Sequence, residues 1–415
     1  MSVLLPIQAS QSWSCVQAKD KHVLVTNQYG AQPEIHESQA RIQMVSASIC
    51  GADLRIVSGD KETHTTQTKP VILGHEGCGI IQDICFSHPS TDLQIGDFVV
   101  VLPHIHSDRV NGCSRTTSSI LASCTSRKHT HHAGWDFDGV FTDSGIFPTT
   151  NLVPVMPDYR KRASSNTDIG EAIFTLTEPV LCCLSAYELM KREAQVLDLE
   201  IRRPGKALII GCGPIGMMHG IIASEQGYDV WFADTVPQRE LLAQQCLGGG
   251  NIVRSTRNPG RFDIVIVTAN VLDAIQKAET LVKTNGIIYL FAGLNASDRE
   301  ATHPEGIISY EKVHRAARGV LTIIQDKRIL YVGHSGYDAS LAPKAVATVA
   351  TNAARFAKIV TGTLNGWSSS TIQACSENVT DWHTNDGSPA IIPVLEGKAD
   401  LHRHGKLIIH AGHPA

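Results

Sequence analysis

Three short motifs carry side chains that could hold a catalytic metal ion. The first is Cys50-Gly-Ala-Asp53, the second is His75-Glu76, and the third contains Glu178. A thiolate, an imidazole and a carboxylate with one position left open describe a catalytic zinc site. Sequence spacing alone does not force these groups together. Taken singly, Cys50 could be a buried thiol, His75 a hydrogen-bonded core histidine and Glu178 an acid at a helix N-terminus.

A glycine-rich turn follows the apolar run of residues 207–210 and opens a helical segment. Its spacing is G-x-G-x-x-G, in which the glycines allow a tight turn, a close approach of the backbone to a pyrophosphate and close helix–strand packing. The free N–H groups of the helix N-terminus would face the phosphates. The candidate cofactor-binding residues of this turn are Gly211, Gly213, Pro214, Ile215 and Gly216.

Asp234 occupies the position where such sites carry an acid, about 20 residues beyond the turn. Its carboxylate would accept from ribose hydroxyls and repel a 2′-phosphate, which favours NAD over NADP. Arg239, roughly one helical turn later and expected near the adenine, weakens that preference slightly. Two alternatives are a glycine-rich turn without a ligand and an FAD site, but FAD proteins usually carry this fingerprint at the N-terminus.

The pattern of secondary structure that the sequence predicts around these groups changes near residue 170. Before it, short β-branched runs such as 21–26 and 40–48 predict a β-rich part, and residues 102–134 predict a long surface loop. After it, strands alternate with helices of 10–15 residues, which implies a parallel sheet covered on both faces. Mixed β structure returns after a helix expected at 341–357. The predicted class is α/β, with a nucleotide domain inserted into a β-rich domain.

Composition limits the functions that are possible. The 415 residues predict two or three domains, and 42% hydrophobic and 18% charged residues are typical of a globular enzyme. A net charge of −4 argues against a nucleic-acid partner. The N-terminus lacks a signal-peptide pattern, and no run of about 20 apolar residues predicts a membrane span. Eleven scattered cysteines fit a reduced compartment, so a cytoplasmic location is expected.

Together these motifs resemble the medium-chain dehydrogenase/reductase superfamily, in its zinc-containing alcohol and polyol branch. Beyond the motifs above, the resemblance rests on Gly96-Asp97-Phe-Val, on Asp138-Gly-Val-Phe through Asn151-Leu, on Glu178-Pro and on Tyr331-Val-Gly-His-Ser-Gly. It implies a GroES-like catalytic domain around an inserted Rossmann domain, with the active site between them. The expected boundaries are 1–184 and 353–415 for the catalytic domain and 185–352 for the NAD-binding domain.

The resemblance also assigns roles to the candidate metal-site residues. Cys50 and His75 would be zinc ligands, and Glu76 and Glu178 would be ligands or water-bridged neighbours. Cys182 is a rival to Glu178, because other relatives have a cysteine ligand near that place. Asp53 would orient an imidazole ligand.

Two departures from the family pattern bear on catalysis. Ala52 stands where relatives often have a hydroxyl that relays the alcohol proton, and Arg55 stands where a histidine is common. Arginine stays protonated and cannot shuttle protons, but it could bind an anionic group of the substrate. A solvated or ion-paired arginine is an equal alternative. Only Cys113 and Cys124 fall where many relatives carry four structural-zinc cysteines, so we expect one zinc per subunit.

These observations predict a zinc-dependent alcohol or polyol dehydrogenase that uses NAD. Its substrate would be a secondary alcohol, such as a polyol, cyclitol, sugar or sugar phosphate, or the corresponding ketone. Alternatives are a zinc-free NADPH-dependent quinone or enoyl reductase and a non-catalytic nucleotide-binding protein. Relatives pair through the Rossmann sheet edge, which predicts a homodimer or homotetramer with residues 331–335 at the interface.

Overall fold

The structure is a computed structural model of the 415-residue chain. It describes residues 12–19, 22–29, 33–59, 71–85, 92–106, 130–201, 204–253, 261–303, 308–375, 381–384, 386–398 and 405–411. Cys113 and Cys124 lie outside the described residues. The expectation about a structural zinc therefore stays a prediction.

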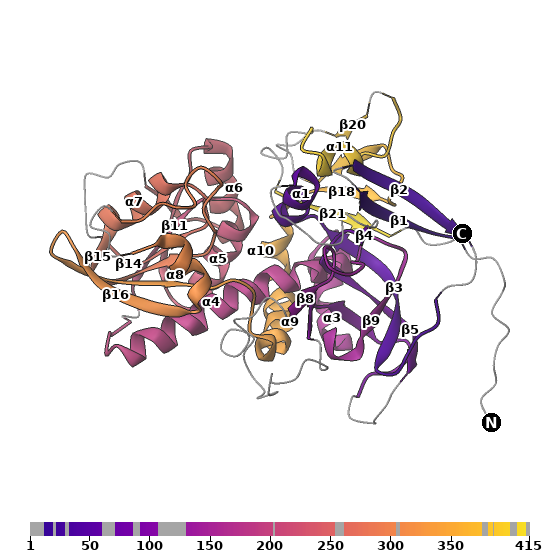
Figure 1. The fold of residues 1–415 in the computed structure, drawn as a ribbon, viewed down its shortest axis with the longest axis horizontal. Helices are drawn as coiled ribbons and strands as arrows, with labels where there is room; N and C mark the ends of the chain where they lie inside the picture. Colours follow the sequence, from indigo (N-terminus) through magenta and orange to yellow (C-terminus); the bar gives the residue numbers. More distant parts are fainter. Residues whose placement is uncertain are drawn as a thin grey trace.

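The apolar runs between residues 206 and 333 form a seven-stranded sheet, coloured from pink to orange in Figure 1. Its strands are β11 (Lys206–Ile210), β12 (Asp229–Ala233), β13 (Asn251–Ile252), β14 (Phe262–Val267), β15 (Val282–Leu290), β16 (Arg318–Ile324) and β17 (Lys327–Gly333). Their order is β13-β12-β11-β14-β15-β17-β16, and all neighbours are parallel except β16 with β17. The parallel part has the strand order of dinucleotide-binding folds, which confirms the predicted α/β class. The antiparallel edge strand β16 was not predicted.

Helices cover this sheet, and two of them begin at prolines. The helices are α4 (Thr177–Val196), α5 (Pro214–Glu225), α6 (Pro237–Leu247), α7 (Leu272–Leu281) and α8 (Tyr310–Ala316). Pro214 and Pro237 stand in the first turn of α5 and α6, where the missing N–H costs no hydrogen bond. Both predicted helix starts are therefore confirmed. The short helix α8 was not predicted.

The β-rich part draws strands from both ends of the chain. Its larger sheet contains β3 (Gln39–Ser48), β5 (Glu76–Cys85), β6 (Phe98–Val101), β9 (Ser144–Pro148), β10 (Leu152–Pro154), β18 (Val360–Asn365), β19 (Thr371–Ala374), β20 (Trp382–His383) and β21 (Lys406–His410). A smaller sheet joins β1 (Ser12–Lys19), β2 (His22–Tyr29) and β4 (Val71–Ile72). β21 pairs with β3, so the indigo and yellow strands lie side by side in Figure 1. The insertion of the nucleotide-binding part into a β-rich fold is confirmed, while the boundaries 1–184, 185–352 and 353–415 stay predictions.

Short elements complete the fold and correct two expectations. They are α1 (Gly51–Ser58), β7 (His104–His106), β8 (Thr130–His132), η1 (Thr149–Asn151), α3 (Pro157–Asn166), η2 (Gly170–Leu176), η3 (Ala339–Leu341), α9 (Ala342–Thr351), α10 (Ala353–Ala357) and α11 (Ile391–Leu395). The single helix expected at 341–357 is wrong, because the chain breaks at Asn352 between α9 and α10. The expected loop 102–134 is wrong at its ends, where β7 and β8 pair.

One continuous apolar core joins the two parts through α4. The cluster runs from Val100 of β6 through Leu181 of α4 to Ile209 of β11, all fully or nearly fully buried. Among the described residues, the segment Gly170–Val196 is long and apolar enough to cross a membrane, but 89% of its most apolar window is buried inside the protein. A buried core helix passes the same test, so this segment is weak evidence for a membrane span.

Candidate active site

Helix α1 fixes the position of Cys50. The residue precedes the first turn of the helix, and its backbone N–H donates to Asp53 Oδ2 at 2.8 Å. The preceding residue, Ile49, donates its N–H to Leu407 O in β21. The thiol is therefore held between the end of β3 and the C-terminal strand.

His75 is aimed by the tight turn before it and by Asp53. Gly74 has φ +87°, and a β-carbon there would lie 2.2 Å from the ring of Phe141, so only glycine fits. Asp53 Oδ1 lies 3.1 Å from His75 Nδ1, which leaves Nε2 for another ligand. Burial disfavours the charged ring, but Asp53 and Cys50 outweigh burial and raise the pKa of His75 well above its usual range.

The structure brings Cys50, His75 and Glu76 together. One ligand atom from each lies within 4.8 Å of the other two. A zinc ion that takes sulfur at about 2.3 Å and nitrogen or oxygen at about 2.0–2.2 Å holds its ligand atoms within roughly 4.5 Å of one another. The donor types and their spacing therefore fit a zinc ion, and Asp53 is placed to orient His75.

A buried lysine that the sequence did not single out holds Glu76. Lys406 Nζ donates to both carboxylate oxygens of Glu76, at 2.5 Å to Oε1, and Ser48 Oγ donates to Oε2. Nζ also donates to Ile49 O at 3.0 Å. Lys406 is 3% exposed and Glu76 is fully buried. The sequence feature that could have indicated this role is a single lysine at the start of the apolar strand 406–410.

Glu178 and Cys182 stand beside this cluster without joining it within 4.8 Å. They lie one turn apart on α4, where Cys182 Sγ donates to Glu178 Oε1 at 3.4 Å. The pKa of Glu178 is raised to about 7. Burial is the largest cause of this rise, and the charges of His75 and Lys406 partly offset it. Burial and Glu178 raise the pKa of Cys182. Glu178 is thus an electrostatic neighbour of the cluster.

Three ring side chains form a wall next to His75. His132 stacks on Trp135 with ring centroids 3.6 Å apart, and it meets His75 edge-on at 5.5 Å and His104 at 4.6 Å. His132 Nδ1 lies 2.8 Å from Ala133 O. His104 and His132 fall within the region predicted as a loop, 102–134, and Trp135 directly follows it, so no local pattern indicated that these rings would lie here.

Arg55 does not join the metal cluster. It is exposed on α1, and its charge is close enough to lower the pKa of His314 on α8. Arg55 therefore faces the nucleotide-binding part of the molecule from the β-rich part.

The glycine-rich turn has the geometry that a pyrophosphate site needs. Gly211 has φ +99°, and a β-carbon on Gly216 would lie 1.9 Å from Gly211 O. Nothing lies within 4 Å of a β-carbon on Gly213, so the backbone there is open to a ligand. Pro214 and Ile215 begin α5 directly behind this opening. The turn fits a dinucleotide at the carboxyl end of β11.

Asp234 closes this turn at the carboxyl end of β12. Its Oδ2 accepts from the Cys212 N–H at 2.6 Å, and its Oδ1 accepts from the Val236 N–H at 2.8 Å. Each carboxylate oxygen can accept a further hydrogen bond. Arg239 lies in the first turn of α6, and its charge lowers the pKa of Cys212, while burial raises it more. Both residues therefore lie near the fingerprint turn, and their roles in cofactor binding stay predictions.

Asp53→Asn tests the orientation of His75. The amide keeps the size of the carboxylate but removes its charge, and its oxygen can satisfy only one of the two donors, Cys50 N–H and His75 Nδ1–H. We expect zinc affinity to fall roughly 10- to 100-fold, because the group that fixes an imidazole ligand is lost. Competition with a fluorescent zinc chelator measures this. Asp97→Asn, in an exposed turn, is the control; equal affinities in both variants would refute the role of Asp53.

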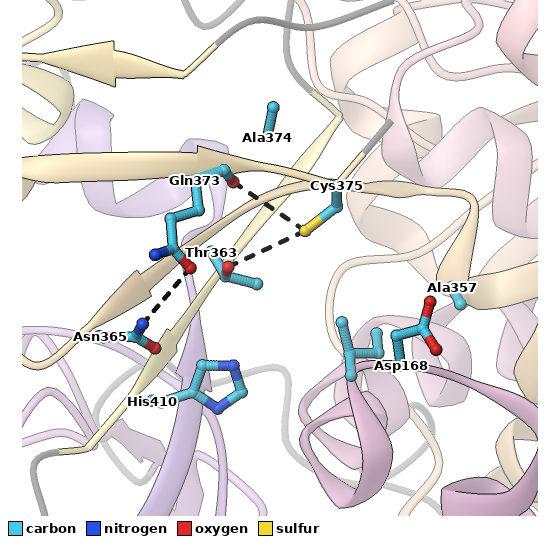
Figure 2. A pocket seen from close by; sticks show the side chains of 9 residues that line it. Asp168, Ala357, Thr363, Asn365, Gln373, Ala374, Cys375 and His410 are labelled. Atoms are coloured by element: carbon cyan, nitrogen blue, oxygen red, sulfur yellow. Dashed lines mark hydrogen bonds between the residues drawn. The ribbon is translucent and has the colours of Figure 1, made fainter. Parts of the chain in front are cut away.

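A separate recess of about 570 Å³ lies beside β18, β19 and β21. Figure 2 shows Asp168 across this recess from Thr363, Cys375 and His410. The Cys375 thiol contacts Thr363 Oγ1 at 3.9 Å, and partial burial raises its pKa, so the thiol stays protonated. None of the predicted site residues lines it.

Comparison with known proteins identifies the β-rich part. Residues 36–158 match the family of alcohol dehydrogenase GroES-like domains. The chain is 25% identical to L-threonine 3-dehydrogenase from Pyrococcus furiosus over 260 residues, which are 59% of this chain and 63% of that enzyme. The alignment thus spans less than two thirds of that relative.

Solved structures share the whole fold at low identity. Galactitol-1-phosphate dehydrogenase from Escherichia coli has a TM-score of 0.68 at 17% identity, with 96% of this chain and 99% of that chain covered. Glucose dehydrogenase from Haloferax mediterranei, solved with NADP, Zn and gluconolactone, has a TM-score of 0.68 at 15% identity, with 97% and 100% covered.

The fold and the matched domain are those of the medium-chain dehydrogenases and reductases. Residues 36–158 therefore match an alcohol dehydrogenase GroES-like domain, and the whole chain shares its fold with these dehydrogenases.

Proposed function

We propose that the protein is a zinc-dependent oxidoreductase that interconverts a secondary alcohol and its ketone with NAD(H). The observation that carries this proposal is the approach of Cys50, His75 and Glu76 within 4.8 Å, in a chain that also carries an open dinucleotide turn. The similar proteins named above are all dehydrogenases, which supports this class of reaction.

Each residue of the cluster has a distinct task in this proposal. Cys50 and His75 hold the metal, and Asp53 keeps His75 Nε2 directed toward it. When bound, the zinc ion acts as a Lewis acid that polarises the substrate oxygen. Lys406 and Ser48 hold the Glu76 carboxylate at the edge of the site.

The remaining protein ligand would come from a carboxylate. Glu76 is within ligand distance of the other two groups but is already bonded by Lys406 and Ser48. Glu178 accepts a hydrogen bond from Cys182, and the charges of His75 and Glu76 lower and raise its pKa, respectively. We propose Glu178 as the residue that exchanges with Glu76, and we keep Cys182 as its rival.

NAD rather than NADP is proposed from Asp234, whose carboxylate lies at the carboxyl end of β12. We expect Asp234→Asn to tighten NADPH binding roughly tenfold, because the repulsion between two negative charges is removed while an acceptor for the Cys212 N–H is kept. NADH and NADPH fluorescence titrations measure the two dissociation constants. Asp229→Asn, at the opposite end of β12, is the control. An unchanged NADPH affinity in Asp234→Asn would retire this reason for NAD preference.

The substrate is proposed to be a polyol, cyclitol, sugar, sugar phosphate or amino alcohol, with Arg55 available for an anionic group. If Arg55→Ala leaves the KM and kcat of an anionic substrate unchanged, that role is wrong. The free thiols among the described cysteines suit a reducing compartment, and we propose a cytoplasmic location.

We also propose a homodimer or homotetramer, but with a corrected interface. Tyr331 is fully buried, and β16 covers β17 on its outer side. The sheet edge open to a second copy is therefore β16, where Ile323 is 63% exposed.

A turnover screen tests the proposed function. Zinc-loaded protein is mixed with NAD and candidate alcohols, and NADH is followed by absorbance, before and after chelation of the metal. We expect at least one alcohol to give turnover that chelation abolishes and zinc restores. Turnover of quinones with NADPH in metal-free protein would favour the zinc-free reductase. Cofactor binding without any turnover would favour a non-catalytic relative.

A further inference from the structure

A loop of the nucleotide-binding part reaches the ring side chains that pack next to His75. We call these three side chains the ring wall: His104, His132 and Trp135. Tyr337 lies in the loop after β17 and is only 1% exposed. Its hydroxyl oxygen accepts a hydrogen bond from the His104 backbone N–H at 3.1 Å, and the two rings meet edge-on with centroids 4.5 Å apart. Tyr337 therefore joins the nucleotide-binding part to the ring wall.

The loop that carries Tyr337 is held on both sides. Gly336 has φ +97°, and a β-carbon there would lie 3.4 Å from His104 Cε1, so glycine lets the loop approach β7 closely. On the other side, the Asp338 N–H donates to Ser185 Oγ at 2.9 Å in α4. These contacts fix Tyr337 between α4 and β7.

The Tyr337 phenol is neutral and serves β7 as a hydrogen-bond acceptor. Burial raises the pKa of Tyr337 most, and the negative charge of Glu178 on α4 raises it further, while the hydrogen bond from His104 lowers it less. On the other side of the same residue, Asn151 Nδ2 donates to His104 O at 2.7 Å. Both backbone polar groups of His104 are thus bonded to side chains, and the hydroxyl group of Tyr337 is one of the two that hold this strand.

The ring wall packs against the imidazole of His75. The His132 ring lies 4.6 Å from the His104 ring and 5.5 Å from the His75 ring, centroid to centroid, and the Trp135 ring lies 5.6 Å from that of His75. Asp53 bonds His75 Nδ1, but one hydrogen bond does not by itself fix the plane of the ring. Close packing against neighbouring rings restricts its rotation. The ring wall therefore helps to set the direction of His75 Nε2.

We infer that Tyr337 is a positioning residue for the metal centre, because its hydroxyl group holds the ring wall against His75 and so keeps Nε2 directed at the metal. The inference rests on the proposed function, which makes His75 a zinc ligand. Tyr337 was not among the predicted site residues. Its role means that the nucleotide-binding part helps to determine the metal affinity of the β-rich part.

Tyr337→Phe tests this role, because it removes the hydroxyl group and keeps the ring. Tyr310→Phe is the matched control: it removes a buried hydroxyl group that donates to Glu279 Oε1 at 2.7 Å, within the nucleotide-binding part. Competition with a fluorescent chelator measures zinc affinity, and the visible absorption of Co²⁺-substituted protein reports the coordination of the metal. We expect Tyr337→Phe to bind zinc roughly tenfold more weakly and to shift the cobalt bands, while Tyr310→Phe keeps wild-type values in both measurements.

Ser185→Ala disturbs the loop more gently and keeps the test decisive if Tyr337→Phe does not fold. It removes the acceptor of the Asp338 N–H and leaves Tyr337 and the ring wall intact, so a smaller change in the same direction is expected. Melting temperatures of the metal-free proteins, measured by calorimetry, separate lost stability from lost positioning.

Wild-type zinc affinity and cobalt spectra in every folded variant at the loop would overturn the inference, even if those variants melt at lower temperatures. Equal losses in Tyr337→Phe and Tyr310→Phe would also overturn it. A wild-type protein that binds neither metal would refute the proposed metal centre together with the inference. A wild-type protein that binds zinc, responds to Tyr337→Phe as expected and oxidises no alcohol would refute the proposed function alone.

Discussion

Cys50→Ala is expected to lower the rate of alcohol oxidation at least about a thousandfold, with loss of bound zinc. The thiolate is one of the groups that gather within 4.8 Å, and Lewis-acid stabilisation is worth several kcal/mol of the barrier. Zinc content by plasma mass spectrometry and kcat/KM for the alcohol found in the screen are measured on the same samples.

Two variants control this experiment. Cys375→Ala removes an exposed thiol outside the cluster and should leave zinc content and rate unchanged. His75→Asn keeps a donor toward Asp53 but removes Nε2, so it should match Cys50→Ala. Full zinc content and activity in Cys50→Ala would mean that the thiol is a structural core residue, which is the alternative the sequence left open.

Lys406→Met is expected to destabilise the protein strongly. It leaves the carboxylate of Glu76 buried without its cation, and breaking a buried ion pair in this way costs about 3–5 kcal/mol. The melting temperature of the β-rich part should fall by roughly 5–15 °C, measured by calorimetry on chelated protein.

The matching double variant isolates the cause. Lys406→Met with Glu76→Gln removes both charges, so most of the lost stability should return. Lys406→Arg keeps a cation and should lose less. Equal melting temperatures for wild type and Lys406→Met would show that the ion pair does not contribute to folding.

The sequence was a good guide wherever a local pattern determines the structure. The apolar run at 206–210, the glycine fingerprint and Pro214 predicted β11, its turn and α5 at their observed positions. Hydrophobic periodicity and turn-forming residues are properties of neighbouring positions, so they can be recognised without any knowledge of the fold.

The same reasoning failed where contacts join distant parts of the chain. Glu76 and Lys406 are separated by 330 residues, and only the pairing of β3 with both β5 and β21 brings them together. Helices α1 and α8 have eight and seven residues, too short for a helical period to be recognised. The proximity of Arg55 to His314 is therefore evident only in the structure.

The family resemblance supplied what local patterns could not. It grouped Cys50 and His75, and their closeness in the structure agrees with that grouping. It also suggested Glu178 as a ligand, whereas the structure puts Glu76 nearer to the other two groups, in contact with Lys406.

The central claim is a single zinc ion held by Cys50 and His75. X-ray diffraction at the zinc absorption edge, on crystals of protein purified without chelators, tests it most directly. The account predicts one anomalous peak per chain, at bonding distance from Cys50 Sγ and His75 Nε2. A zinc-replete crystal with no peak between those two atoms would contradict it.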